Sequence, residues 1–297
     1  EGFQRIAGTL PGEAMRCPLE MRVEEEVDCG SYVRRLISYL SQPGGRVPAY
    51  LCVPKVVLGG GKAPAVLCLH PTENKIGHKV VVGLGGRPHR QYASELAERG
   101  FVTLSPSYPL LADYQPDLKG LGMTSGTLKA IWDNIRAVDL LETLPEVDAS
   151  RIGCIGHSLG GHNAIFTAVF DQRLKAVVSS CGFSSMQKDD VPSWTGRTYM
   201  PLIASEFKND PKLLPFDFHE LVAAIAPRAF FASAATKDSD FDVSGVQDVI
   251  NAARPIYALH GKADDLVGHY PEAGHSFPED SRRRAYEFLE RALEKRQ

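Results

Sequence analysis

The sequence predicts an α/β protein with a mostly parallel central sheet and helices on both faces of that sheet. Short apolar runs, of the kind found in strands buried on both faces, occur at residues 63–69, 151–155 and 175–180. Amphipathic segments of helical length separate such runs along the chain. Strands that alternate with helices are joined by right-handed crossovers and form a parallel sheet, in which chemistry gathers at the carboxyl ends of the strands.

The remaining elements follow from turn signals and periodicity. Residues 32–40 and 47–53 are predicted as two strands joined by the turn at Ser41-Gln42-Pro43-Gly44-Gly45. The further strands are expected at 101–104, 228–233 and 267–270, and the helices at 92–99, 127–144, 218–226, 243–259 and 281–293.

The chain is predicted to be organised around one domain. Residues 1–30 are mixed and charged and are expected to form an N-terminal extension packed on that domain, which spans residues 31–297. Within it, residues from about 182 to 216 fit neither the helix nor the strand period and are rich in aromatic side chains. This segment follows the strand after residue 175, where a small cap over a pocket is expected.

Composition indicates which partners and settings to expect. Lys plus Arg number 33 and Asp plus Glu 36, for a net charge of −3, and no basic cluster suited to nucleic acid is present. No apolar run reaches the roughly 18 residues of a membrane span. The six cysteines form no dense framework, so reduced thiols and a cytoplasmic protein are expected. Because the sequence starts at Glu1 instead of Met, a trimmed leader is compatible with it.

A strand, a sharp turn and a helix are predicted around Ser158. The run at 151–155 ends at Gly156-His157-Ser158-Leu159-Gly160, and an amphipathic pattern follows. The string Gly-x-Ser-x-Gly is common by chance, but between a buried strand and a helix it is typical of a nucleophile elbow. A strained turn there exposes the serine hydroxyl, and the flanking glycines allow close approach of the two backbones. Ser158 is therefore the predicted nucleophile.

His275 is the predicted base. A serine hydroxyl needs an adjacent base held by an acid, and in this type of fold the chain order is nucleophile, acid, histidine. His275 lies in the glycine-bearing loop 271–278, between the last strand and the last helix, and so can reach Ser158 above the sheet. His157 and His162 flank the elbow instead of lying on a loop opposite it. His157 is expected to turn away from the side that Ser158 faces, but its position keeps it among the candidate pocket residues.

The acid is predicted to be Asp238, which follows the strand at 228–233 and precedes His275 by 37 positions, enough for a helix and a short strand. Asp240 is the first alternative, and Asp242 is close by. Asp264 lies in a Gly-x-x-Asp string of the kind that often marks the acid, but only 11 positions separate it from His275. These aspartates also fit a helix start near residue 243.

Two backbone donors are expected to form an oxyanion hole. One is the N–H of Leu159, next to the nucleophile. The other is assigned to Thr72, because Pro71 has no N–H. His70 is expected to buttress this loop or to line the pocket, and Trp194 and Tyr199 of the cap segment are candidate pocket residues.

The sequence resembles the α/β-hydrolase superfamily, and within it the branch of dienelactone hydrolases, acetyl xylan esterases and prolyl-oligopeptidase-like enzymes. The resemblance runs from about residue 32 to the end, through the strings Leu-Cys-Leu-His-Pro-Thr at 67–72, Gly-His-Ser-Leu-Gly-Gly at 156–161, Ala-Pro-Arg at 226–228 and Gly-His-Ser-Phe-Pro at 274–278. It implies Ser158, Asp238 and His275 as a triad. Serine in place of the cysteine of dienelactone hydrolases, and the lack of an oligopeptidase propeller, favour an esterase.

The predicted function is thus hydrolysis of a small carboxylic ester, such as a carbohydrate acetyl ester, through an acyl-enzyme and without cofactor or metal. The histidines are scattered, with no metal-ligand spacing among them. The alternative activity is a peptidase of the prolyl-oligopeptidase-like type acting on short peptides. A non-catalytic binding protein is disfavoured because its triad would be broken. No partner other than a small-molecule ester, and no oligomeric state, is predicted.

Overall fold

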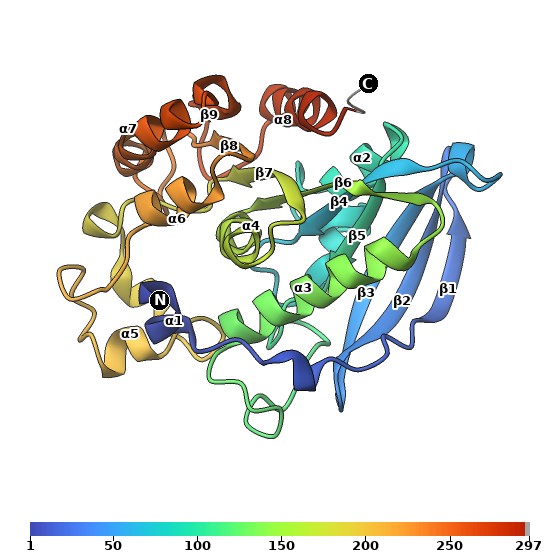
Figure 1. Cartoon of the computed structure of the whole chain (residues 1–297), viewed down its shortest axis with the longest axis horizontal. Coiled ribbons are helices and arrows are strands. Elements are labelled where there is room, and N and C mark those ends of the chain that lie inside the picture. Colours follow the sequence, from blue (N-terminus) through green and yellow to red (C-terminus); the bar gives the residue numbers. More distant parts are fainter. Residues whose placement is uncertain (295–297) are drawn as a thin grey trace.

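The computed structural model describes residues 1–294, and nine strands within them form one sheet in the order β1-β2-β3-β5-β4-β6-β7-β8-β9 (Figure 1). The strands β1 to β3 and β5 pair antiparallel, and the pairs from β5 to β9 are parallel. The strands are β1 (Arg22–Asp28), β2 (Tyr32–Gln42), β3 (Gly45–Pro54), β4 (Ala63–Leu69), β5 (Val102–Pro106), β6 (Val147–His157), β7 (Leu174–Ser180), β8 (Ala229–Ser233) and β9 (Leu266–His269).

Helices cover both faces of this sheet, as Figure 1 shows. Successive side chains of a strand point to opposite faces. In β4, Leu67 and Leu69 pack in a core that includes α3 and α4, whereas Val66 and Cys68 pack in a second core with α2 and α8. The predicted class, an α/β fold with a mostly parallel sheet, is confirmed. The helices are α1 (Gly2–Ala7), α2 (Tyr92–Glu98), α3 (Gly126–Thr143), α4 (Leu159–Phe170), α5 (Leu202–Ser205), α6 (Phe218–Ile225), α7 (Val243–Leu259) and α8 (Glu279–Ala292).

The N-terminal residues contribute more than a packed extension. Residues 22–28 form β1, an edge strand of the sheet paired with β2, so the predicted boundary at residue 30 falls inside a hairpin. This strand was not predicted because the run Glu24-Glu25-Glu26 lacks the alternation of apolar and polar residues that marks a half-buried strand. An exposed edge strand can carry charged residues instead. Helix α1 is anchored through Phe3, whose ring centroid lies 4.4 Å from that of Phe166.

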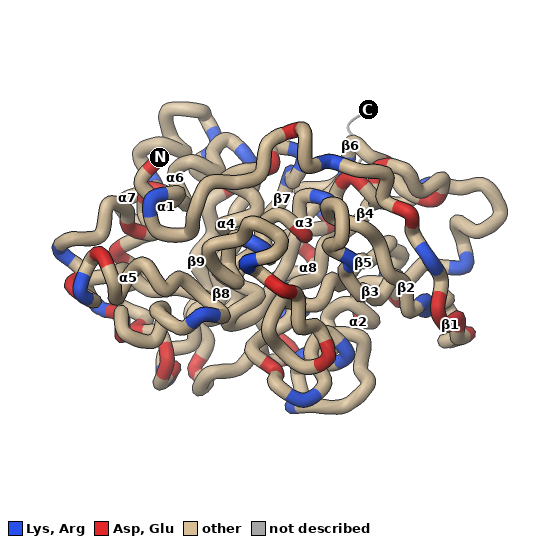
Figure 2. Tube along the Cα trace, turned by 90° about the horizontal axis from the view of Figure 1, so that it is seen from below, with Lys and Arg blue, Asp and Glu red and all other residues tan. Residues whose placement is uncertain are grey.

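Charges of both signs are distributed along the whole chain. In the view from below, Lys and Arg alternate with Asp and Glu instead of separating to opposite sides (Figure 2). Among the helices of residues 1–294, none combines the length and the apolar character needed to cross a bilayer.

Candidate active site

Ser158 occupies a strained turn between β6 and α4. Its φ of 54° and ψ of −122° lie in a region that side chains other than glycine rarely adopt. A Cβ atom on Gly156 would lie 2.0 Å from the carbonyl oxygen of Gly160, and one on Gly160 would lie 2.0 Å from that of Leu69. Both positions therefore require glycine, and the turn has the geometry predicted for a nucleophile elbow.

His275 and Asp238 form a hydrogen-bonded pair. Nδ1 of His275 lies 2.9 Å from Oδ1 and 3.1 Å from Oδ2 of Asp238, which follows β8. Oδ1 also accepts hydrogen bonds from the backbone N–H groups of Asp240, at 2.9 Å, and Phe241, at 3.3 Å. Burial raises the pKa of Asp238, but the hydrogen bonds from His275 and Asp240 outweigh it and hold the pKa below its usual value. Asp238 is thus an ionised acceptor fixed against the imidazole.

The other aspartates of the two loops have different places. Asp240 Oδ2 lies 3.5 Å from Nε2 of His275, on the opposite edge of the ring, and its side chain is 55% exposed against 1% for Asp238. Asp242 caps α7 by accepting a hydrogen bond from the N–H of Ser244. Asp264 precedes β9, at the amino ends of the parallel strands. Only Asp238 is placed to hold Nδ1 of the imidazole.

Ser158 lines two cavities. The first, of about 290 Å³, is also lined by Leu159, Trp194 and Tyr199, and we call it the cap-side cavity. The second, of about 650 Å³, is also lined by His275, and we call it the histidine-side cavity. In residues 1–294 no hydrogen bond joins the hydroxyl of Ser158 to His275. The two side chains nevertheless border one space, so a substrate in it can contact both.

The loop after β4 lies beside Ser158. Thr72 lines both cavities together with Ser158, and its hydroxyl lies 3.2 Å from the Tyr199 hydroxyl of the segment 182–216. Leu159 is the first residue of α4, and N–H groups of a first helical turn have no partner within the helix. Both residues expected to supply oxyanion donors therefore border the space in front of Ser158.

His70 lines neither cavity. Its Nδ1 lies 2.7 Å from the carbonyl oxygen of Pro71, and its Nε2 accepts a 2.9 Å hydrogen bond from the N–H of Tyr108. Burial lowers its pKa to about 4, so the ring is neutral. His70 thus joins the loop after β4 to the loop after β5, which is the buttressing position and not the pocket position.

Of the two histidines that flank Ser158, His157 differs in orientation from what was expected. His157 lines the histidine-side cavity instead of turning away, and its ring centroid lies 5.0 Å from that of His275. It is fully buried, and burial, followed by the charge of Arg90, holds its pKa well below the usual value. His162 lines the cap-side cavity, 4.6 Å from the Trp194 ring, and burial lowers its pKa to about 3.

One group of potential metal ligands includes the His–Asp pair. Cys181 Sγ, the Asp238 carboxylate and Nδ1 of His275 lie within 4.8 Å of one another. Burial raises the pKa of the Cys181 thiol to about 12, and the thiol contacts the carbonyl oxygen of Ser276 at 3.4 Å. The Cys181 thiol thus donates to a backbone carbonyl, and Nδ1 of His275 is held by the Asp238 carboxylate. The arrangement instead suits proton transfer.

Two functional candidates escaped the sequence analysis. Arg90 lines the histidine-side cavity and donates a 3.1 Å hydrogen bond to the carbonyl oxygen of His275. Asp189 lines the cap-side cavity, and its Oδ2 is buried without a hydrogen-bond partner. The string Gly-Gly-Arg-Pro-His-Arg at 85–90, in the long loop after β4, was a signal for the first. Asp189 had no such signal, because its segment lacks periodicity.

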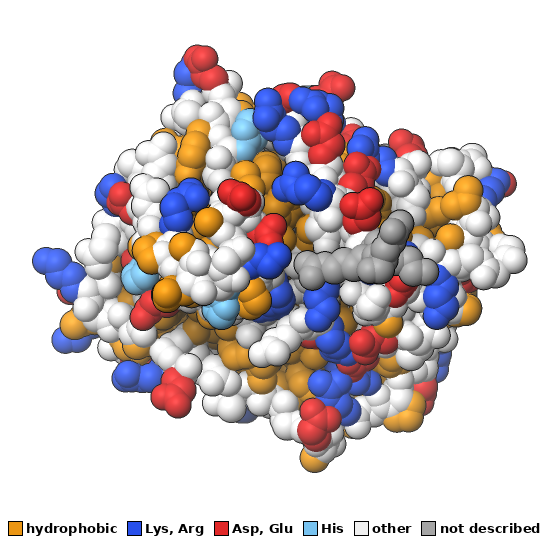
Figure 3. Space-filling view, turned by 45° about the horizontal axis from the view of Figure 1, so that its top comes forward, with side chains coloured by type: hydrophobic (Ala, Val, Ile, Leu, Met, Phe, Trp, Pro, Cys, Tyr) orange, Lys and Arg blue, Asp and Glu red, His pale blue; other side chains and the backbone are white. Residues whose placement is uncertain are grey.

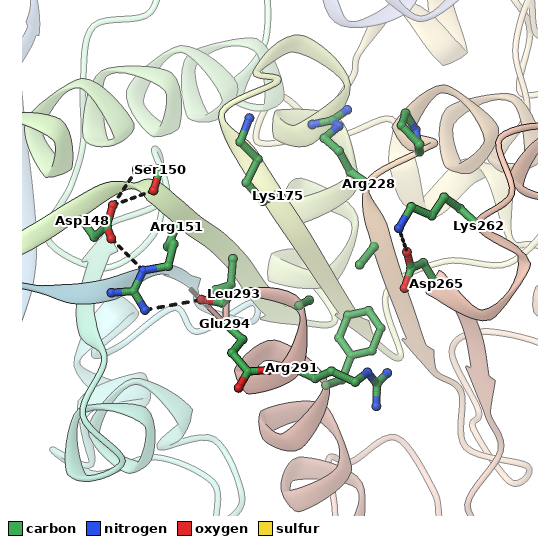
Figure 4. A pocket seen from close by; sticks show the side chains of 14 residues that line it. Asp148, Ser150, Arg151, Lys175, Arg228, Lys262, Asp265, Arg291, Leu293 and Glu294 are labelled. Carbon is green, nitrogen blue, oxygen red and sulfur yellow. Dashed lines mark hydrogen bonds and ion pairs between the residues drawn. The ribbon is translucent and has the colours of Figure 1, made fainter. Parts of the chain in front are cut away.

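A third cavity, of about 830 Å³, lies at the amino ends of the parallel strands, opposite the end where Ser158 lies. Arg151, Lys175 and Arg228 line it near the amino ends of β6, β7 and β8 (Figure 4). Figure 3 views the molecule tilted from the orientation of Figure 1 and shows acidic and basic side chains next to one another across this face. Dashed lines in Figure 4 join Arg151 to Asp148 and Lys262 to Asp265, so these charges are paired. Active sites of such sheets lie at the carboxyl ends of the strands, as Ser158 does.

The fold and part of the sequence match known esterases. Residues 117–261 match the family model described as "Glucuronyl esterase, fungi". A glucuronoyl esterase from Solibacter usitatus superposes with a TM-score of 0.76 at 19% identity, covering 98% of this chain and 89% of that one. The acetyl xylan esterase 1 of Thermoanaerobacterium gives 0.63 at 18% identity, with 97% of each chain covered. The chain has the α/β-hydrolase fold.

Relatives in sequence agree with this assignment. The chain is 24% identical to a Bacillus subtilis protein named "Putative hydrolase YtaP", over 97% of both chains. It is 27% identical to the 4-O-methyl-glucuronoyl methylesterase of Hypocrea jecorina, over 60% of this chain and 43% of that protein. The chain thus spans less than half the length of that methylesterase. Relatives whose names state a substrate are carbohydrate esterases.

Proposed function

We propose that this α/β-hydrolase is a serine hydrolase of carboxylic esters and that its substrates are carbohydrate esters. The observation that supports it best is the pairing of His275 with the buried carboxylate of Asp238 at the border of a cavity that Ser158 also lines. A nucleophile, a base and an orienting acid in that relation are what ester hydrolysis by serine requires. The names of the relatives direct the choice of substrate toward carbohydrates.

In the proposed mechanism, His275 takes the proton of Ser158 as the hydroxyl attacks the ester carbonyl. Asp238 stabilises the imidazolium and holds its Nδ1 proton. The N–H groups of Leu159 and Thr72 receive the oxyanion of the tetrahedral intermediate. His275 then gives its proton to the leaving alcohol, and water releases the acyl group from Ser158 by the same route in reverse.

This proton path indicates which part of the substrate occupies each of the two cavities. The leaving oxygen must lie next to His275, so the alcohol belongs in the histidine-side cavity. The acyl group then occupies the cap-side cavity, which Trp194 and Tyr199 line together with Asp189. Aromatic faces and an acceptor carboxylate are groups that contact the apolar faces and the hydroxyls of a sugar, so a uronic acid acyl group fits this cavity. An acetyl group would leave most of its volume of about 290 Å³ empty.

The segment from about 182 to 216 acts, in this proposal, as a cap that closes the acyl side of a single domain, whose sheet includes β1. It contributes Trp194 and Tyr199 from its turns of helix and the loop between them. All six cysteines are free thiols, which is compatible with the proposed cytoplasmic setting.

The test compares ester hydrolysis by the parent chain with that by Ser158→Ala and His275→Ala. Substrates are benzyl glucuronate, p-nitrophenyl acetate and an aminoacyl-p-nitroanilide. We expect hydrolysis of the two esters, a loss of at least about 10³-fold in kcat for either variant, and labelling of Ser158 by a fluorophosphonate. Esterase activity unchanged in Ser158→Ala would overturn the proposal. Cleavage of the anilide alone would establish the peptidase alternative.

A further inference from the structure

A buried arginine faces the proposed leaving-group side of the site. Arg90 is 4% exposed and lines the histidine-side cavity. Its guanidinium donates to two neutral acceptors, the carbonyl oxygens of His89 at 3.3 Å and His275 at 3.1 Å. Among residues 1–294 it has no carboxylate in ion-pair contact. Removing a charge from water without a counter-charge is costly, so such an arginine is a candidate for a ligand-binding role.

Further cations surround the same cavity. Arg87 and Lys75 are exposed residues that line it, and neither takes part in an ion pair within the described part of the chain. Burial is the largest effect on the pKa of Arg90 and lowers it; Tyr92 and Cys181 raise that pKa, and the charges of Arg87 and Arg282 lower it. Within residues 1–294, none of the three cations Lys75, Arg87 and Arg90 has a carboxylate in ion-pair contact, so these positive charges are unpaired.

Two acidic residues, Glu73 and Asp240, line the same cavity beside the three cations. Glu73 accepts a hydrogen bond from the backbone N–H of Lys75, at 3.0 Å. Asp240 lies 3.5 Å from His275, on the rim between the two cavities. The cap-side cavity differs in charge, because Asp189 and Asp190 line it and no Lys or Arg does among the residues described for it.

A purely structural role does not account for this arrangement. Two carbonyl oxygens can be held by a neutral amide or by water, without a charge that must be buried. Arg87 makes no side-chain hydrogen bond in the described residues, so its place on the wall has no structural explanation of that kind. Planar guanidinium groups match carboxylates through two parallel hydrogen bonds.

We propose that the histidine-side cavity binds a leaving-group alcohol that carries a carboxylate, held by Arg90 and Arg87. This rests on the proposed function, because His275 must protonate the alcohol for that cavity to be the leaving-group side. The preferred substrate is then an ester whose alcohol is itself acidic, such as a hydroxyl of a chain bearing uronic acid groups. Lys75 contributes long-range attraction at the cavity mouth.

The test uses a matched pair of esters, 4-acetoxybenzoate and methyl 4-acetoxybenzoate, which differ in one charge on the leaving phenol. Each kcat/KM is divided by the rate constant for hydroxide-catalysed hydrolysis of the same ester, which removes the difference in leaving-group reactivity. We expect the normalised ratio of anionic to neutral ester to be about ten or more. The normalised ratio should approach one in each of the single variants Arg90→Gln and Arg87→Gln. Arg90→Lys should retain part of the preference for the anionic ester.

The matched control is Arg22→Gln, which removes one exposed charge from β1, at the other end of the sheet, and should leave the ratio unchanged. Binding of 4-hydroxybenzoate and of its methyl ester to the Ser158→Ala variant, by calorimetry, tests the same preference without catalysis and without altering either arginine. Equal normalised rates for the parent enzyme, or a ratio that survives both Gln variants, overturns the inference. Failure to hydrolyse either ester contradicts the proposed function instead, and the calorimetric preference then decides the inference.

Discussion

Replacing Asp238 with Asn tests the role of the buried carboxylate with the least change in shape. One oxygen, Oδ1, accepts from the N–H of Asp240 at 2.9 Å, and both oxygens lie within 3.1 Å of Nδ1 of His275. An amide has one acceptor and one donor group. If its NH₂ takes the place of Oδ1, it meets the backbone N–H of Asp240, and two donors face each other. If its NH₂ takes the place of Oδ2, the amide oxygen keeps the bond from Asp240, but the NH₂ meets the Nδ1 proton. The second orientation, which keeps the backbone hydrogen bond, disfavours the imidazole tautomer with hydrogen on Nδ1.

The expected loss follows from that tautomer. An imidazole with its proton on Nε2 has no lone pair on that atom and so cannot take the Ser158 proton there. The imidazolium form also loses the negative charge of Asp238 that stabilises it. We expect kcat for p-nitrophenyl acetate to fall by about 10³- to 10⁴-fold at pH 7, with little change in the thermal midpoint. The matched control is Asp240→Asn, since that carboxylate lies on the Nε2 edge and is 55% exposed.

The assay is steady-state ester hydrolysis, with the concentration of intact sites set by fluorophosphonate titration of the parent protein and folding checked by circular dichroism. Asp240→Asn should reduce kcat by less than about tenfold. The assignment of Asp238 as the acid is wrong if Asp238→Asn retains more than a tenth of the parent kcat while the kcat of Asp240→Asn falls a thousandfold. That result would assign the role of the acid to Asp240.

Three further predictions concern stability. Burial raises the pKa of Asp189 from 3.8 to about 7, so the protonated carboxyl contributes stability that is fully present below about pH 4 and is lost as the pH rises through 7. The Asp189→Asn variant should not show this loss and should be more stable than the parent at pH 8, by at most about 4 kcal/mol. Identical urea midpoints of the two proteins at pH 8 would contradict this prediction. Gly160→Ala, whose Cβ meets a backbone oxygen of β4 at 2.0 Å, should cost about 3 kcal/mol or more in thermal unfolding, whereas Gly59→Ala, with nothing within 4 Å, should be nearly neutral. Lys129 and Asp133 form a fully buried ion pair, so Lys129→Met should lower the free energy of unfolding in urea by about 3–5 kcal/mol. The double variant Lys129→Met with Asp133→Leu should regain most of this free energy, because it leaves no unpaired buried charge. Equal losses in the single and the double variant would argue against a stabilising pair.

Much of this protein could be read from local sequence patterns. The buried strands and the helices of the parallel part lie within a few residues of the predicted ranges, because unbroken apolar runs and helical periodicity both reflect burial between layers. The turn at Ser158 was predictable for a related reason, since Gly156 and Gly160 leave no room for a Cβ atom. The exposed strand β1 was missed because nothing in its charged sequence marks pairing to β2.

The sequence by itself determined the layered fold, the position of the nucleophile and the order of the residues proposed to assist it. Only the tertiary structure decided between Asp238 and Asp240, which share one loop and differ in which edge of the His275 ring they contact. It alone brought Arg90, from a long loop without periodicity, to the carbonyl of His275, 185 positions away. Local patterns record how a segment is buried, whereas the meeting of side chains from separate loops depends on how the whole sheet arranges its carboxyl ends.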